Sequence, residues 1–173
     1  MIKPSPLLLL FILILMASPA PAADNQVVIQ AREAGVGHCL PVVETLSNFL
    51  IGTARHGTDD VWATTNTDQQ LYTTTIERSD RQGIQLSSLS VAPVAAGGCS
   101  AVYEQVQWFD SSCLVVAQEI YGNFTYKGVL ADKVAVLGGP ASVYLYPAGS
   151  GCLAIKKEVI INAESLNRDK TKP

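Results

Sequence analysis

The chain opens with an unbroken apolar run and then changes to short segments in which apolar and polar residues alternate. Leu7 to Met16 is a run of ten apolar residues, and it follows the positive charge of Lys3. Ala20-Pro21-Ala22 then places small residues at the positions that a signal peptidase recognises. Ten residues are too few to span a bilayer, because a membrane-spanning helix needs about 20. We therefore predict that residues 1–22 are a secretory signal peptide.

One later stretch has the spacing of an amphipathic helix of about three turns. Its apolar face consists of Leu40, Val43, Leu46, Phe49 and Leu50. Pro41 suits a first helical turn, and Gly52 ends the helix. Upstream, the β-branched run Val27-Val28-Ile29 predicts a short strand or an extended arm. The helix must pack its apolar face on another element.

From residue 61 onward the pattern predicts strands separated by polar turns. The expected strands cover residues 61–65, 71–76, 84–91, 100–109, 114–121, 126–137, 143–146 and 153–161. Short connections force antiparallel neighbours, since a parallel crossover needs about a dozen residues or more. The predicted fold is a single α+β domain over residues 23–162, in which an N-terminal amphipathic helix packs on a twisted, mainly antiparallel sheet of about 6–8 strands. The polar residues 163–173 are predicted to be a disordered tail.

Four cysteines, Cys39, Cys99, Cys113 and Cys152, follow the predicted export signal. An even number in that context indicates two disulfides, and without a Cys-x-x-Cys pair a zinc site lacks its usual signature. A hairpin around residues 110–112 would place Cys113 opposite Trp108, far from Cys99. Because a disulfide needs Cα atoms within about 7 Å, Cys99–Cys113 is disfavoured. Cys39–Cys99 with Cys113–Cys152, and Cys39–Cys113 with Cys99–Cys152, both stay open.

Composition excludes some functions and leaves few catalytic candidates. The 12 basic residues are scattered against 15 acidic ones, so the chain lacks the basic patch of a nucleic-acid-binding protein. Cys39, with His38 beside it, could act as a thiol nucleophile, and His56 could act as its base. A disulfide at Cys39 would leave no free thiol for this reaction. His56 also stands near Asp59 and Asp60, a set that suits acid–base or metal chemistry and equally an ordinary turn. We predict no catalytic residue, no metal and no cofactor.

Two charges interrupt apolar rows of the predicted strands. Lys157 falls in the row of Leu153, Ile155, Val159 and Ile161, and Glu104 falls in the row of Val102, Val106 and Trp108. A charge that faces a core is costly unless it is paired. One interpretation is a wet binding groove lined by both charges, with Tyr144 and Tyr146 as contact residues. The other is that the charges pair across the sheet or turn to solvent.

These features favour an exported, periplasmic or secreted, non-catalytic module that binds, inhibits or assembles with another envelope or extracellular protein. No stable membrane span is expected after signal cleavage. One alternative is a small exported hydrolase, which requires His38, His56 and an acid in one cleft. Another is a carrier of a small apolar ligand, which requires an enclosed apolar pocket of about 300 Å³ or more. A contact module requires an exposed apolar or tyrosine-bearing sheet face or edge.

Overall fold

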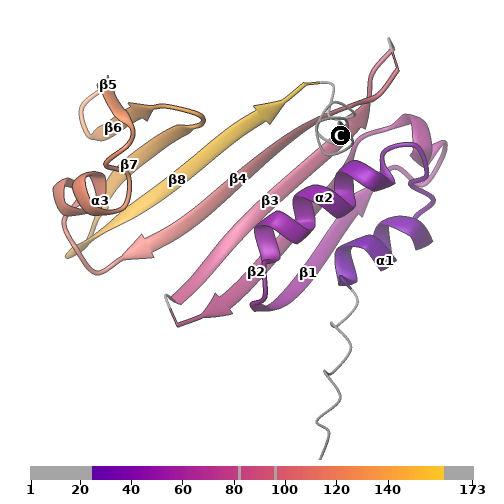
Figure 1. Cartoon of the computed structure of the whole chain (residues 1–173), viewed down its shortest axis with the longest axis horizontal. Helices are drawn as coiled ribbons and strands as arrows, with labels where there is room; N and C mark the ends of the chain where they lie inside the picture. Colours follow the sequence, from indigo (N-terminus) through magenta and orange to yellow (C-terminus); the bar gives the residue numbers. More distant parts are fainter. Residues whose placement is uncertain (1–24, 82, 96, 162–173) are drawn as a thin grey trace, which may run out of the picture.

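The computed structural model describes residues 25–81, 83–95 and 97–161. The predicted signal peptide and the predicted polar tail lie outside these described residues. Within them, three α-helices and one eight-stranded antiparallel sheet form an α+β fold (Figure 1). The predicted α+β class, the antiparallel sheet and the two disulfides are therefore confirmed. No helix in the described ranges is both long enough and apolar enough for a membrane crossing.

The chain builds two successive units, each with helical structure followed by four strands. The first contains α1 (Gln26–Glu33), α2 (Leu40–Ile51), β1 (Arg55–Trp62), the short 3₁₀ helix η1 (Thr67–Gln69), β2 (Tyr72–Asp80), β3 (Gly83–Pro93) and β4 (Cys99–Phe109). The second contains α3 (Cys113–Glu119), β5 (Thr125–Leu130), β6 (Val134–Gly138), β7 (Ser142–Ala148) and β8 (Gly151–Ile160). Each set of four strands is an antiparallel meander.

The two units join edge to edge through β4 and β8, which pair antiparallel. The strand order is β1-β2-β3-β4-β8-β7-β6-β5, so exchanging the two units reverses the order and leaves the topology unchanged. The sheet therefore has an approximate two-fold axis between β4 and β8. Glu104 lies opposite Lys157 in the register, five residues after Cys99 and five residues after Cys152 respectively. The approximate axis passes through this pair.

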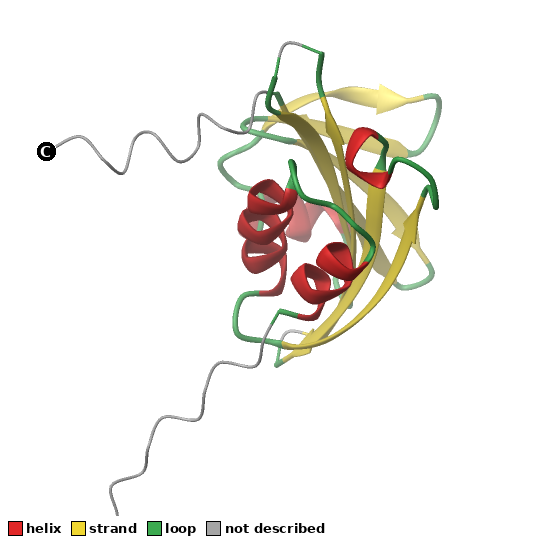
Figure 2. Ribbon diagram, turned by 90° about the vertical axis from the view of Figure 1, so that its right-hand side faces the viewer, coloured by secondary structure: helices red, strands yellow, loops and turns green. Residues whose placement is uncertain are grey.

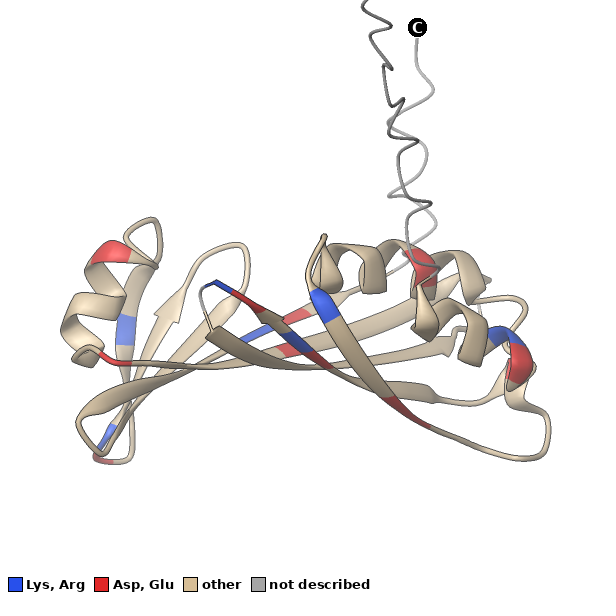
Figure 3. Ribbon diagram, turned by 90° about the horizontal axis from the view of Figure 1, so that it is seen from below, with Lys and Arg blue, Asp and Glu red and all other residues tan. Residues whose placement is uncertain are grey.

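All three helices lie on one face of the sheet, which curves around them (Figure 2). Under α1 and α2 the core includes Val43, Leu50 and Leu89, all fully buried. Under α3 a smaller core gathers around Val116 and Val143. The opposite face of the sheet carries no helix of the described residues (Figure 3).

Each disulfide ties the start of a helix to the start of a strand within its own unit. Cys39, at the N-terminus of α2, is bonded to Cys99 in β4, with Cα atoms 5.8 Å apart. Cys113, the first residue of α3, is bonded to Cys152 in β8, with Cα atoms 4.9 Å apart. This is one of the two pairings that the sequence left open, and Cys99–Cys113 is indeed absent.

The prediction of a strand over residues 114–121 is wrong, because this segment begins with α3. The Ser112 hydroxyl caps the helix by accepting a hydrogen bond from the Val115 amide at 3.4 Å. The predicted hairpin at residues 110–112 is therefore wrong too. The conclusion drawn from it, that Cys99 does not bond to Cys113, is nevertheless correct. The sequence did not predict this helix, because its Val115-Val116 pair has low helix propensity. The packing of Val116 and the disulfide at Cys113 hold the segment in a helix instead.

Three further boundaries differ from the prediction. The first strand covers Arg55–Trp62 and not residues 61–65. The run Val27-Val28-Ile29 lies in α1 and not in a strand or arm, and the Asn25 side chain caps that helix by accepting from the Val27 amide at 3.1 Å. Residues 126–137 are not one strand, since β5 and β6 form a hairpin there. Ala131 in the turn adopts a positive φ of 48°, which the sequence does not signal because it is not a glycine.

Candidate functional site

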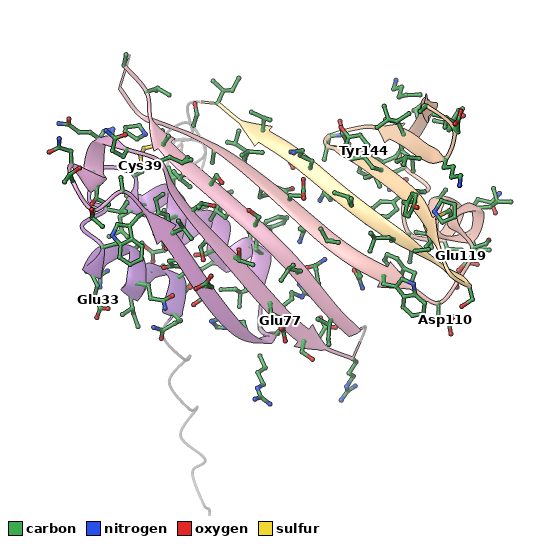
Figure 4. All side chains as sticks on the ribbon, turned by 180° about the vertical axis from the view of Figure 1, so that it is seen from behind. Glu33, Cys39, Glu77, Asp110, Glu119 and Tyr144 are labelled. Atoms are coloured by element: carbon green, nitrogen blue, oxygen red, sulfur yellow. A yellow bond between two sulfur atoms is a disulfide. The ribbon has the colours of Figure 1, made fainter. Side chains whose placement is uncertain are left out.

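The sheet face that points away from the helices, called the open face below, is defined by strand alternation. In β4 the residues Cys99, Ala101 and Tyr103 are buried beneath the helices, so the even-numbered residues project to the other side. In β8 the Lys156 ammonium lies 5.7 Å from the ring of Tyr103 on the helix side. Lys157 and the residues that alternate with it are therefore on the open face. Figure 4 views the molecule from this side.

Cross-strand pairing arranges the open face into rows that run across the strands. One row joins Trp108, Leu153 and Tyr146. The next joins Leu86, Val106, Ile155, Tyr144 and Val136. A third row is polar and contains Ser88, Glu104, Lys157 and Ser142, and a fourth joins Ser90, Val102 and Val159. Apolar rows therefore lie on both sides of the charged row.

The apolar row of β8, which contains Lys157, does not face the core. The expectation that Lys157 interrupts a core-facing row is therefore wrong. Val159 is 66% exposed, whereas Cys152 and Ala154 in the alternate row are buried. The helix-facing row of β8 thus contains small residues, and these let α3 lie close to the strand to which its disulfide joins it. The larger apolar side chains are left on the open face.

The four predicted groove residues share the open face. Glu104 and Lys157 lie opposite each other in the register and form an ion pair at 3.1 Å, so the pairing interpretation is the one observed. Their side chains are 35% and 47% exposed, and an ion pair with that exposure contributes about 1 kcal/mol or less to stability. Tyr144, labelled in Figure 4, and Tyr146 lie on β7 opposite Ile155 and Leu153 of β8, and therefore on the same face.

Trp108 is the largest side chain of the open face, and sequence reasoning assigned it to a core row. It is 48% exposed and lies over Gly151, where a Cβ atom would come within 2.7 Å of its indole ring. Ile84 and Leu86, which are 64% and 47% exposed, extend the apolar surface onto β3 and were not predicted as site residues. Because they alternate with Gln85 and Ser87, the sequence indicated that Ile84 and Leu86 share one face of a strand. A single strand does not show which of its faces a helix covers.

A polar hollow of about 600 Å³ lies where β1, β2 and β3 meet. Its lining includes Arg55, Asp59, Glu77 and Leu86. Glu77 lies opposite Leu86 in the register, so the hollow continues the second apolar row of the open face toward β1. Charged groups therefore border the apolar surface at this end.

His38 and Cys39 are not brought together with His56, although His56 and Asp59 both line the polar hollow. The His38 and Gly37 amides donate to the Asp68 carboxylate at 2.6 and 2.7 Å, and these hydrogen bonds, that of His38 first, lower the pKa of Asp68. His56 lies beyond the other end of α2, a helix about 18 Å long. The Cys39 thiol is consumed in a disulfide. A nucleophile–base pair is therefore not formed by His38, Cys39 and His56.

The two aspartates near His56 point to opposite faces of β1. Asp60 accepts a hydrogen bond of 2.6 Å from the Tyr72 hydroxyl, and burial, followed by this bond, raises the pKa of Tyr72. Asp59 faces the open side at the polar hollow. Within the described ranges no three His, Cys, Asp or Glu side chains cluster closely enough to hold a metal ion.

The open face is the candidate functional site. Neither a protein-family model, nor a curated protein, nor a solved structure matches this chain. The chemistry that the face offers is apolar and aromatic contact around one ion pair, with a polar hollow at one end.

Proposed function

We propose that this protein is an exported, non-catalytic contact module, periplasmic or secreted, that binds another protein through its open face. The exposed aromatic and aliphatic rows around Trp108 carry the proposal. Contiguous apolar surface of this kind marks interaction sites on soluble proteins, and large aromatic side chains are enriched at interfaces and dominate their binding energy. Glu104 and Lys157 supply polar specificity within that surface.

Export is supported by the cysteines and by the N-terminal sequence. Both disulfides close within one chain, and such bonds persist in oxidising compartments. Residues 1–22 have the charge, the apolar run and the small residues of a signal peptide. A carrier function has less support, because the space between α2 and the sheet is filled by fully buried side chains such as Leu50 and Leu89.

Site-specific photo-crosslinking in intact cells tests the proposal. A photoreactive phenylalanine analogue replaces Leu86 on the open face, and in a matched variant it replaces Leu114, which is 68% exposed on the helix side. We expect a discrete protein adduct from position 86 and none from position 114. Combining the probe at 86 with Trp108→Ser should deplete the adduct. Equal labelling from both positions, or none from position 86, would contradict the proposal.

A further inference from the structure

We infer that the partner seated on the open face is a second copy of this chain, packed sheet against sheet. The inference rests on the proposed function, because it names the occupant of the same face. Three properties of the face support it: the apolar area that it offers, the position of its two charges, and the match of its rows under one particular two-fold rotation.

The exposed apolar area is close to what a dimer requires. Around the central pair, on β3, β4, β7, β8 and the residue after β8, six large apolar side chains of the open face are at least 42% exposed: Ile84, Leu86, Trp108, Tyr146, Val159 and Ile161. A fully exposed large side chain presents about 150–250 Å², so together these six offer roughly 600 Å². A stable interface buries about 800 Å² per partner, and the half-buried neighbours in the same rows supply the remainder.

The central ion pair selects the symmetry of the dimer. Two sheets that pack face to face can be related by an axis along the strands or by an axis across them. An axis across the strands, through the central pair, would place Glu104 against Glu104 of the partner subunit and Lys157 against the partner's Lys157. An axis parallel to β4 and β8, midway between them, instead places Glu104 against the partner's Lys157. Charge complementarity therefore selects the axis along the strands.

The same axis also superposes apolar residues on apolar residues, although the charges alone were used to choose it. Rotation about an axis along the strands keeps each row at its own height and exchanges β4 with β8 and β3 with β7. Trp108 then lies against the partner's Leu153, and Leu86 lies against the partner's Tyr144. Ser88 lies against the partner's Ser142 at the ends of the charged row. The match of the rows is therefore compatible with the arrangement that the charges select, in which the sheets pack about 10 Å apart.

Charge reversal with mixing tests this arrangement by sedimentation equilibrium over the micromolar range. Glu104→Lys puts two lysines, and Lys157→Glu puts two glutamates, at the centre of each copy. We expect the wild type to dimerise and each single variant to bind itself about tenfold more weakly or worse. An equimolar mixture of the two variants should regain the wild-type dimer, because each copy then meets the opposite charge on its partner.

Controls separate the interface from the fold. Far-ultraviolet circular dichroism checks that each variant is folded, and Leu86→Ser should weaken dimerisation whereas Leu114→Ser, on the helix side, should not. A monomeric wild type, single variants that dimerise normally, or a mixture that fails to recover would each overturn the inference. A monomer that still forms an adduct with a different protein from position 86 would overturn the second-copy inference alone. Loss of every adduct would overturn the proposed function as well.

Discussion

Replacing both cysteines of the second disulfide by alanine should release α3 while leaving α2 in place. The two helices differ in what holds them besides sulfur. α2 buries several large side chains, among them Val43 and Leu50 at 0% exposure. α3 has seven residues and buries only Val116. A helix of that length is not stable by itself in water.

Loop closure alone does not distinguish the two disulfides. The cysteines of Cys39–Cys99 are 60 residues apart and those of Cys113–Cys152 are 39 residues apart. The chain-entropy relation gives about 4.3 kcal/mol for the longer loop and about 3.9 kcal/mol for the shorter one. Global stability should therefore fall by similar amounts in the two double variants. The difference should appear locally, in the protection of the helix that each disulfide anchors.

Urea unfolding measures the global loss, and hydrogen exchange followed by mass spectrometry measures the local one. In Cys113→Ala/Cys152→Ala we expect exchange of the α3 amides to rise well above the rate set by global unfolding. In Cys39→Ala/Cys99→Ala the α2 amides should exchange only through global unfolding. Leu114→Ala, at an exposed position of α3, is the control. Unchanged α3 protection in the first variant would refute the reasoning, because packing would then suffice to hold the helix.

Two further predictions concern stability. Between the ordinary tyrosine pKa of 10.0 and the raised pKa of Tyr72, only the unfolded state ionises, so the unfolding free energy should fall as pH rises, by up to about 1.4 kcal/mol per pH unit. Tyr72→Phe should reduce that slope in alkaline urea titrations and should also free the Asp60 carboxylate; an unchanged slope would argue against the shift. Gly151→Ala forces a Cβ against the backbone carbonyl oxygen of Phe109 and against the Trp108 ring, and should cost about 1–3 kcal/mol, with altered tryptophan fluorescence. Gly57→Ala, where a Cβ meets nothing within 4 Å, is its control, and equal losses would contradict the packing argument.

Strand periodicity predicted most of the sheet, because each meander is local and its turns are short. It failed at α3, where Leu114-Val115-Val116 has the composition of a strand. The competing information was not in the segment itself: the helix is held by a disulfide to β8 and by a small core formed with β7 and β8. A local pattern cannot report a contact with residues about 40 positions away.

The sequence correctly predicted which residues of the candidate site share a face. It wrongly predicted that this face is buried. Alternation correctly placed Glu104 with Trp108 and Lys157 with Ile155, and the structure puts all four on one face. The inference that these apolar rows face a core was wrong, because a row of large apolar residues is normally the buried one. In β4 and β8 the helices instead cover the row that contains Cys99, Ala101, Cys152 and Ala154.

A repeat within the sequence shows which cysteines of the two units are equivalent. Cys-Leu-Pro-Val-Val at 39–43 matches Cys-Leu-Val-Val at 113–116, and Gly-Cys-Ser-Ala-Val at 98–102 matches Gly-Cys-Leu-Ala-Ile at 151–155. In both units a proline lies opposite the second cysteine in the register.

The geometry of that repeat leaves only one pairing. Cys99 and Cys152 lie five residues on either side of the approximate axis in antiparallel strands, so they are about 33 Å apart and cannot bond to each other. If Cys39 bonded to Cys113, only Cys99 and Cys152 would be left to form the second disulfide. Because those two cannot bond, this pairing is excluded as well. Cys99–Cys113 is excluded by distance, because β4 carries Phe109 about 33 Å away from Cys99 and the four residues from there to Cys113 span at most about 14 Å. Each unit must therefore close its own disulfide, and this is why we expect loss of the Cys113–Cys152 bond to act on α3 and not on α2.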